Sequence, residues 1–574
     1  MTQLKGRLFR YLIGVPTVLA FAAVSPAADD APGATTAATT ANAGQASSQS
    51  PEVQELKRQL AEQQKQIDEL RMILLGQKKQ IDTVTNATAA PAVPPAPTTV
   101  SDPVKRGIGE VASTTPILPP APIHASLVPP LPQAAPSAEP NPLQIKIGDA
   151  TIQPIGFMDL TNTFRSTNAG TSLQTNFGSI PYTNTIPGRL TEDKFSAANS
   201  RIGFRVDAMA KDWHIMGYYE GDFVGGVAAN NTQVSSNSLL YRIRLYWVDL
   251  RKNKFEFLAG QSWSMMTPNR KQISALPGDL FYSQVVDVNY MNGLTWGRVP
   301  GLRILYHPSE KVTFGLSAEN GVQYFGGSGG GGLPTLPSAL STPIGGQLDE
   351  NVANGITAPN VHPDFIGKLA FDPSSRVHFE LAGVVSSVRL WDPLTNQHNS
   401  KTGGGGSVNG NFELFPGFRL VTNNFWSDGE GRYLFGVAPD FIVRSDGSPS
   451  LIHSGSTVSG FEFAHKNTQL YAYYGGIFIG KNTALDADGK TKIGYGYAGS
   501  ANSQNKTTQE GTGGLTQTIF RDAKYGAVQM MFQYAYFFRN PWSIAPGTPR
   551  NAHESAVWFN LRYVLPGGAP AIKY

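Results

Sequence analysis

The fold is decided by residues 201–223, which read RIGFRVDAMAKDWHIMGYYEGDF. In the first arm every second position is apolar, while Arg201 and Arg205 occupy the alternate positions. The pair Lys211-Asp212 is a tight-turn signal, and a second alternating arm follows it. Alternation with period two over about ten residues on each side of a turn predicts a hairpin of two β-strands with one greasy and one charged face.

The same alternation recurs to the end of the chain. It runs through residues 241–247, 254–260, 302–307, 312–319, 377–381, 528–538 and 557–563. In the first of these segments it assigns Tyr241, Ile243, Leu245 and Trp247 to the greasy face and Arg242, Arg244 and Tyr246 to the charged face. Arms of about ten residues suit tilted strands that cross a bilayer, and aromatics near the strand ends suit its two interfaces. A soluble sandwich, the competing interpretation, has shorter strands and hides its greasy faces between two sheets.

The connections alternate in length. Short ones are expected near residues 211–212, 251–253, 308–310, 372–375 and 465–468. Long ones are expected at 165–196, 224–237, 264–292, 321–362, 393–406 and 481–514. Short turns on one side and long loops on the other are typical of outer-membrane barrels. We therefore predict an all-β transmembrane antiparallel β-barrel of about 16 strands, an even number, over residues 144–574.

Composition excludes several functional classes. The net charge of +4 is too small and too dispersed to indicate a nucleic-acid partner. Cysteine is absent, so there are no disulfides, thiolate metal sites or cysteine nucleophiles. The nine histidines are scattered without metal-ligand spacing. The glycine-rich runs 326–332 and 403–406 lack the Lys-Ser/Thr of a phosphate loop, so we interpret both as flexible loop tips. We expect no catalytic residues, no metal and no cofactor.

The N-terminus predicts export. Three basic residues precede the apolar run of residues 11–24, and small residues follow at Ala27 and Ala28. This order is typical of a secretory signal peptide, here residues 1–28, and the run is short for a membrane span. A single N-terminal anchor helix is the alternative. Residues 29–50 form an Ala/Thr/Ser/Gln tract without periodicity, which indicates disorder.

Residues 51–85 carry heptads, which predict a coiled coil. One core position is filled by Val53, Leu60, Ile67, Leu74 and Ile81, and the other by Leu56, Gln63, Leu70, Gln77 and Val84. The core residues do not distinguish a dimer from a trimer. The alternative to self-association is a lone amphipathic helix packed on its own barrel. Residues 86–143 are rich in proline and predict an extended flexible linker.

Three motifs resemble a known family. They are Tyr219-Glu-Gly-Asp-Phe223, Arg242-x-Arg244 and Leu258-Ala-Gly-Gln-Ser-Trp-Ser264. Together with heptads placed before a barrel, they make the chain similar to the DcaP-like trimeric outer-membrane porins. The resemblance implies a homotrimer of sixteen-stranded barrels in the outer membrane of a Gram-negative bacterium, passing small and often anionic solutes.

Charged residues that share the lumen-facing parity are the candidate pore lining. They are Arg201, Arg205, Arg242, Arg244 and Arg303, opposed by Glu220 and Asp222. Rows of guanidinium and carboxylate create a transverse field, and guanidinium binds carboxylate or phosphate bidentately, which favours anionic solutes. The alternative is that the two signs neutralise each other and line an unselective pore. The loop after Trp263 is expected to fold inward and bring Arg270 and Lys271 to a constriction, unless it contacts a neighbouring subunit instead.

We therefore expect a porin for passive uptake of small hydrophilic, anionic solutes, with outer-membrane lipid around it and the coiled coil in the periplasm. An alternative is a barrel-anchored structural or adhesive protein without a transport function. A lipid-acting barrel enzyme is a third class, but it requires a convergent Ser–His pair, and none stands out in the sequence.

Overall fold

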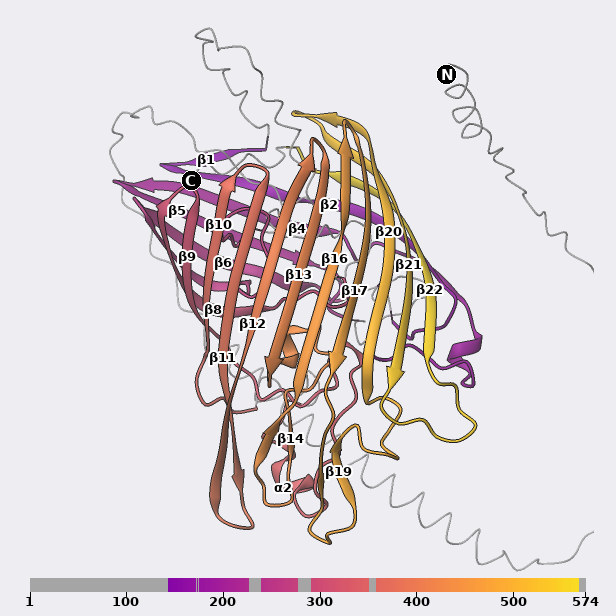
Figure 1. Ribbon diagram of the computed structural model, residues 1–574. Coiled ribbons are helices and arrows are strands. Elements are labelled where there is room, and N and C mark those ends of the chain that lie inside the picture. Colours follow the sequence, from indigo (N-terminus) through magenta and orange to yellow (C-terminus); the bar gives the residue numbers. More distant parts are fainter. Residues whose placement is uncertain are drawn as a thin grey trace, which may run out of the picture. The chain divides into compact units, whose positions relative to one another are not determined.

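The computed structural model describes residues 143–171, 173, 175–226, 239–276, 291–349 and 358–566 (Figure 1). The predicted signal peptide, disordered tract, coiled coil and all of the linker but its last residue lie outside these ranges. Within the described ranges, no helix combines the length and the apolar character that crossing a bilayer requires.

The described chain forms a closed antiparallel barrel of 16 wall strands. These are β2 (Ala150–Arg165), β4 (Arg201–Ala210), β5 (Trp213–Asp222), β6 (Arg242–Lys252), β7 (Phe255–Trp263), β8 (Arg298–Ser309), β9 (Val312–Glu319), β10 (Asp364–Ser374), β11 (Val377–Asp392), β12 (Gln397–Phe415), β13 (Phe418–Asp428), β16 (His453–His465), β17 (Thr468–Ile479), β20 (Asn505–Asp522), β21 (Gly526–Pro541) and β22 (Ala552–Val564). Two short strands, β1 (Ile145–Ile147) and β3 (Glu192–Ser196), pair with β2. The predicted antiparallel barrel and its strand number are confirmed, whereas the coiled coil stays a prediction.

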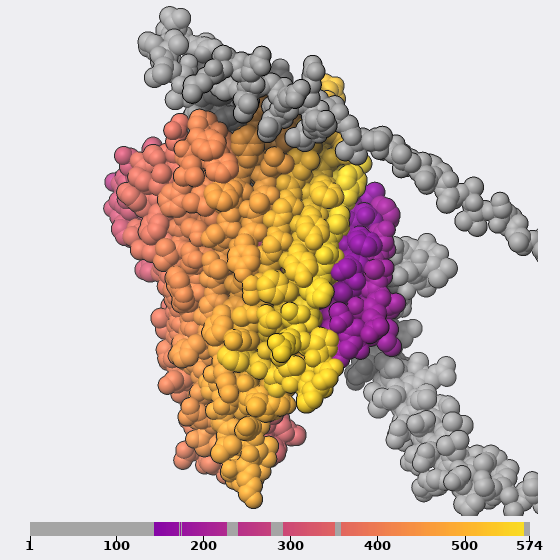
Figure 2. Space-filling model, turned by 45° about the vertical axis from the view of Figure 1, so that its right-hand side comes forward, coloured from indigo at the N-terminus to yellow at the C-terminus, as the bar shows by residue number. Residues whose placement is uncertain are grey.

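Strand β2 closes the barrel because it pairs with neighbours on both edges. Residues 150–157 pair with β4, and residues 157–165 pair with β22. Figure 2 shows this seam, where the yellow C-terminal strands lie directly against the purple N-terminal part of the wall. The two pairings meet at Phe157, next to Gly156, whose φ is +138°, and a Cβ on Gly156 would lie 2.3 Å from the carbonyl oxygen of Arg201. Only glycine fits this position.

The two faces of the wall differ as the alternation predicts. On β4 the outward side chains Ile202 and Phe204 are 57% and 42% exposed, while Arg201 and Arg205 point inward and are buried. The last strand repeats this, with Phe559 and Leu561 exposed and Arg562 buried. The outer surface of the barrel is therefore apolar, and the inner surface is charged.

Strand β6 departs from the predicted alternation. Glu220 of β5 pairs with Leu245, and Gly221 pairs with Ile243, so Arg244 is an extra residue in a β-bulge. A bulge reverses the faces of the residues that follow it. Leu245 and Trp247 are therefore buried inside and Tyr246 is 63% exposed outside, and the prediction for these three residues is wrong.

The connections also correct the sequence interpretation. Residues 403–406 are not a loop tip but lie within β12, paired with β11 and β13, so the turn is only residues 393–396. The long β11–β12 hairpin extends beyond the barrel wall, where β14 (Phe441–Val443) and α2 (Ser341–Gly345) also lie (Figure 1). The run 326–332 is not a free tip either, because a Cβ on Gly331 would lie 2.2 Å from the carbonyl oxygen of Val437. Glycines there allow two backbones to approach closely.

The remaining elements belong to the long connections. They are η1 (Pro187–Arg189), η3 (Ser328–Gly330), η4 (Gly431–Tyr433), β15 (Pro449–Leu451), β18 (Asn482–Leu485) and β19 (Lys492–Tyr495). The turns at 416–417 and 523–525 and the long loops at 429–452 and 542–551 were not predicted from the sequence.

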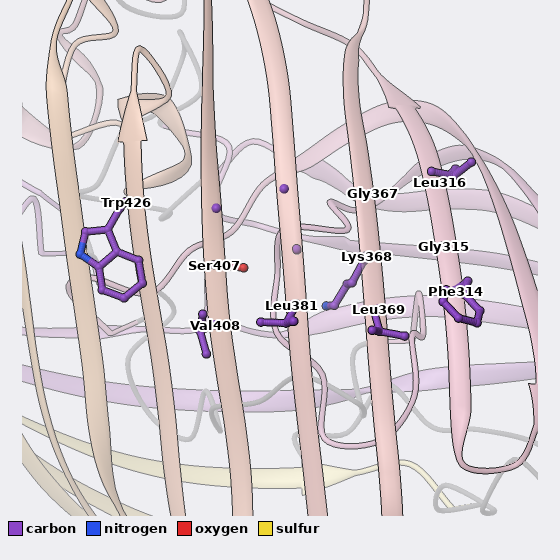
Figure 3. A pocket seen from close by; sticks show the side chains of 13 residues that line it. Phe314, Gly315, Leu316, Gly367, Lys368, Leu369, Leu381, Ser407, Val408 and Trp426 are labelled. Carbon is purple, nitrogen blue, oxygen red and sulfur yellow. The ribbon is translucent and has the colours of Figure 1, made fainter.

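The outer face of the wall is hollowed across β9 to β13 (Figure 3). Three glycines in register, Gly367, Gly383 and Gly406, form the floor of a depression of about 710 Å³ between Leu316 and Trp426. A Cβ on Gly383 would come no closer than 3.7 Å to its neighbours, so the backbone does not require glycine here.

Candidate functional site in the barrel interior

Five of the predicted lumen residues form one ion-pair network on β4, β5 and β6. Arg244 donates from Nε to Glu220 and from Nη1 to Asp222, both at 2.7 Å. Arg242 donates to both oxygens of Asp222, at 3.0 and 2.8 Å. On β4, Arg201 lies 3.6 Å from Glu220. The bulge places Arg244 against both carboxylates at once, so the two signs compensate each other at this point of the wall.

The other two predicted arginines lie outside that network. Arg205 binds both oxygens of Asp207, at 2.6 and 2.7 Å, and His214 contacts the same carboxylate at 3.1 Å. Arg303 on β8 donates to the carbonyl oxygen of Trp263 at 2.5 Å. Sequence reasoning had not singled out Asp207 as a partner, although its parity on β4 gives it the same inward face as Arg205.

The loop after β7 folds into the barrel. Its described parts, residues 264–276 and 291–297, are here named the crossing loop. Backbone amides of this loop donate at 2.8–3.2 Å to inward side chains on five strands: Met265 to Glu319, Asn269 to Glu380, Gln272 to Asp372, Asn292 to Glu510 and Thr295 to Asn423. Buried carboxylates need donors, and the loop amides supply them. The crossing loop therefore bridges the interior from β9 to β20.

The two cations predicted on this loop have different environments. Arg270 forms a bidentate pair with Glu462 of β16, both distances being 2.8 Å, and the hydroxyl of Tyr473 donates to the same carboxylate at 2.7 Å. Lys271 is exposed. Arg270 thus reaches β16, across the interior from β7, after which the crossing loop begins. Lys271 stays in contact with solvent.

A buried lysine on β10 also holds the crossing loop and was missed in the sequence. Lys368 lies 2.9 Å from Glu380 and donates to the carbonyl oxygen of Thr267 at 2.8 Å and to Asn269 at 3.0 Å. His378 contacts the same Glu380 at 3.1 Å. The alternation on β11 had placed His378 and Glu380 inside, but nothing local indicated their partners.

An aromatic side chain near the barrel seam contacts two arginines. The guanidinium carbon of Arg201 lies 5.1 Å from the ring centre of Phe157, and that of Arg562 lies 4.0 Å from it. Arg562 also donates to Asp159 at 2.7 Å. These are cation–π distances. The sequence identified Arg562 as inward-facing but did not indicate this contact.

Apolar side chains from several loops meet inside the barrel. Phe435, from the loop after β13, lies 4.8 Å from Phe177 and 5.8 Å from Trp296, measured between ring centres. Phe177 belongs to the loop after β2, and Trp296 belongs to the crossing loop. Three loops that are distant in sequence therefore share one apolar core in the interior of the barrel.

In the part of the chain that the structure describes, no group of three or more His, Asp or Glu side chains is arranged to hold a metal ion.

Comparison with solved structures relates the fold to known channels. No family model and no curated protein matches the sequence. The outer membrane channel DcaP of Acinetobacter baumannii is similar, with a TM-score of 0.51, 17% identity, 72% of this chain covered and 97% of that chain. An anion-selective porin from Comamonas acidovorans has a TM-score of 0.39 and 10% identity over 72% of this chain and 100% of its own. OmpT of Vibrio cholerae has a TM-score of 0.38 and 8% identity over 73% and 99%. At these identities the likeness concerns the fold alone, and this chain has the fold of the DcaP channel.

Proposed function

We propose that the chain is an outer-membrane porin that lets small hydrophilic solutes diffuse through its barrel. One observation carries the proposal: a closed wall exposes large apolar side chains outside and buries charged ones inside. A closed barrel satisfies every wall amide and carbonyl, which a strand in hydrocarbon requires. Continuous exposed apolar surface of this kind is unfavourable in water. DcaP, whose fold this chain has, is an outer membrane channel.

We further propose that the solutes are anionic and that Arg201, Arg205, Arg242, Arg244 and Arg303, with Glu220 and Asp222, set the preference. Support comes from guanidinium chemistry, since its planar fork matches carboxylate and phosphate. Arg303, which donates to a backbone carbonyl, supplies a positive charge near the crossing loop. The crossing loop with Arg270 is proposed as the constriction, because it bridges opposite walls.

The assembly proposal follows the resemblance: a homotrimer, with residues 51–85 as a periplasmic coiled coil behind a cleaved signal peptide of residues 1–28. Mass determination in detergent by sedimentation tests the trimer, and a monomer would contradict it. A processed chain that stays soluble and monomeric without detergent would contradict the membrane location itself.

Planar-bilayer recording tests the channel. Discrete current steps are expected from the full chain, and a silent barrel would overturn the porin proposal. The reversal potential in a salt gradient then tests the arginines. Arg205→Ala with Arg242→Ala should move selectivity toward cations, because Asp207 and Asp222 each lose a positive partner. Arg444→Ala, in an exposed loop, is the matched control. Unchanged selectivity in the double variant would remove the arginines from the proposal.

A further inference from the structure

Residues 429–440, here named the inner segment, are held inside the barrel by one arginine and three carboxyl groups. Arg432 lies 2.5 Å from Asp440 and 3.2 Å from Glu430, and its Nη2 also binds Asp364. Asp364 belongs to β10, and the other three residues belong to the inner segment. These four residues are named the clasp. They join a loop after β13 to the wall three strands away.

The clasp contains more acid than base. Glu430, Asp440 and Asp364 are 0%, 3% and 2% exposed, so water does not screen them. With all three ionised, Arg432 would leave two uncompensated negative charges in a buried place, which is strongly unfavourable. The neutral donors nearby do not change this count. They are Ser386, which donates to Glu430 at 2.5 Å, and Tyr433, which donates to Asp364 at 2.8 Å.

The other ionisable groups around the clasp in the described ranges do not balance it. Tyr324, from the loop after β9, lies beside Asp440. Glu319, the last residue of β9, lies beside Tyr433. Neither carries positive charge. Desolvation, helped by the neighbouring carboxylates, raises the pKa of Glu430 to about 8 and that of Asp440 to about 7. Both carboxyls thus titrate near neutral pH instead of near their ordinary values.

What the clasp holds is part of the loop core inside the barrel. The carbonyl oxygen of Tyr433 accepts the backbone N–H of Trp296 at 3.0 Å, and Phe435 packs on Trp296 and Phe177. The inner segment is therefore the physical link between the clasp and the crossing loop.

We propose that the clasp is a proton-operated latch, which keeps the inner segment inside the barrel while Glu430 and Asp440 carry protons and releases it when both ionise. Its effect on solute passage rests on the proposed porin function, whereas the release itself does not. Opening of the barrel interior is then favoured by rising pH.

The direction follows from linkage. In a released, hydrated segment both carboxyls ionise near their ordinary values, whereas the clasp retains their protons to higher pH. The free energy that the retained protons contribute to the held state is fully present below about pH 4. It is lost as pH rises through the pKa values that Glu430 and Asp440 have in the clasp, and it no longer changes above them. The ratio of released to held segment grows about tenfold per pH unit for each proton that release gives up.

Thiol labelling measures the release directly, because the chain contains 0 cysteines. Val437→Cys places a single thiol in the inner segment at a position that is 0% exposed. Ser445→Cys places one at an exposed position of the same loop and is the control. The full chain in detergent is treated with a charged thiol reagent across the neutral pH range. The labelling rate of Val437→Cys, divided by that of the control, should rise by at least about tenfold per pH unit between about pH 6 and pH 8 and then level off.

The matched variant removes titration from the clasp without changing its shape. Glu430→Gln with Asp440→Asn, added to Val437→Cys, should keep the thiol protected throughout, and the thiol's own titration cancels in this comparison. Arg432→Gln should expose the thiol already at neutral pH. Circular dichroism checks that each variant keeps its β-structure.

A flat rate ratio in Val437→Cys, or a rise that persists in the Gln/Asn variant, would overturn the latch. Conductance recorded over the same pH range is a separate readout. A barrel that labels as expected but passes no current would contradict the porin proposal and support the latch. Current steps together with a flat rate ratio would support the porin proposal and contradict the latch.

Discussion

Replacing Arg270 by Gln tests whether the crossing loop is held by its ion pair with Glu462. The pair is bidentate at 2.8 Å, and the two side chains are only 12% and 7% exposed. Removing one partner from a buried pair costs about 3–5 kcal/mol, because the other charge stays buried. Tyr473 still donates to Glu462, so we expect the lower end, about 3 kcal/mol.

A double-mutant cycle isolates this energy. Glu462→Gln alone should also destabilise, since Arg270 then loses its counter-charge. The double variant should cost less than the sum of the two, with a coupling of about 2 kcal/mol, because no buried charge remains unpaired. The assay is denaturant unfolding from lipid vesicles, with single-channel conductance measured in parallel. A loop released from β16 should raise the conductance.

The neighbouring Lys271→Gln is the control for stability, because Lys271 is exposed and its removal should leave the stability unchanged. A coupling below about 0.5 kcal/mol, the value of an exposed pair, would show that Glu462 does not anchor the loop. Unchanged conductance with strong coupling would show that the loop is anchored but does not limit the pore.

Further changes in the wall have defined outcomes. Gly156→Ala should cost about 3 kcal/mol or more, because its Cβ would meet the carbonyl oxygen of Arg201 at 2.3 Å with φ at +138°. Gly383→Ala should instead gain up to about 1 kcal/mol, because its Cβ has 3.7 Å of room and alanine orders a strand at lower entropic cost. Lys368→Met should destabilise by about 3 kcal/mol, since Glu380 loses its buried counter-charge at 2.9 Å. Unfolding midpoints from vesicles measure all three.

Alternation along single strands was enough to predict the barrel and most of its two faces. In a strand without a bulge, parity alone decides whether a side chain points in or out, and parity is a local property. The prediction failed on β6, where the bulge at Arg244 depends on how β5 pairs with that strand. The pairing register of two strands cannot be predicted from either strand alone, so the faces of Leu245, Tyr246 and Trp247 could not be predicted from the sequence.

The candidate site divides in the same way. Charged residues on strands with clear alternation were found because inward parity marks them, as for Arg201 and Glu220, whereas Lys368 on β10 was missed. Their partners were not found, because each contact joins residues far apart in the chain. Arg270 and Glu462 are separated by 192 positions, and Asn292 and Glu510 by 218. The inner segment was missed because alternation is blurred there: it is a loop packed inside the barrel and has no strand periodicity to detect.

The charges inside the barrel link loop position to ion selectivity. Near β5 the carboxylates of Glu220 and Asp222 are compensated by arginines of the wall itself. On the strands from β9 to β20 the carboxylates also accept hydrogen bonds from amides of the crossing loop or pair with Arg270, although Glu380 has Lys368 of the wall as well. A loop that leaves the wall therefore uncovers negative charge while it widens the passage. Arg270→Gln should accordingly shift the reversal potential toward cations as its conductance rises, whereas a wider pore of unchanged selectivity would mean that these carboxylates lie away from the solute path.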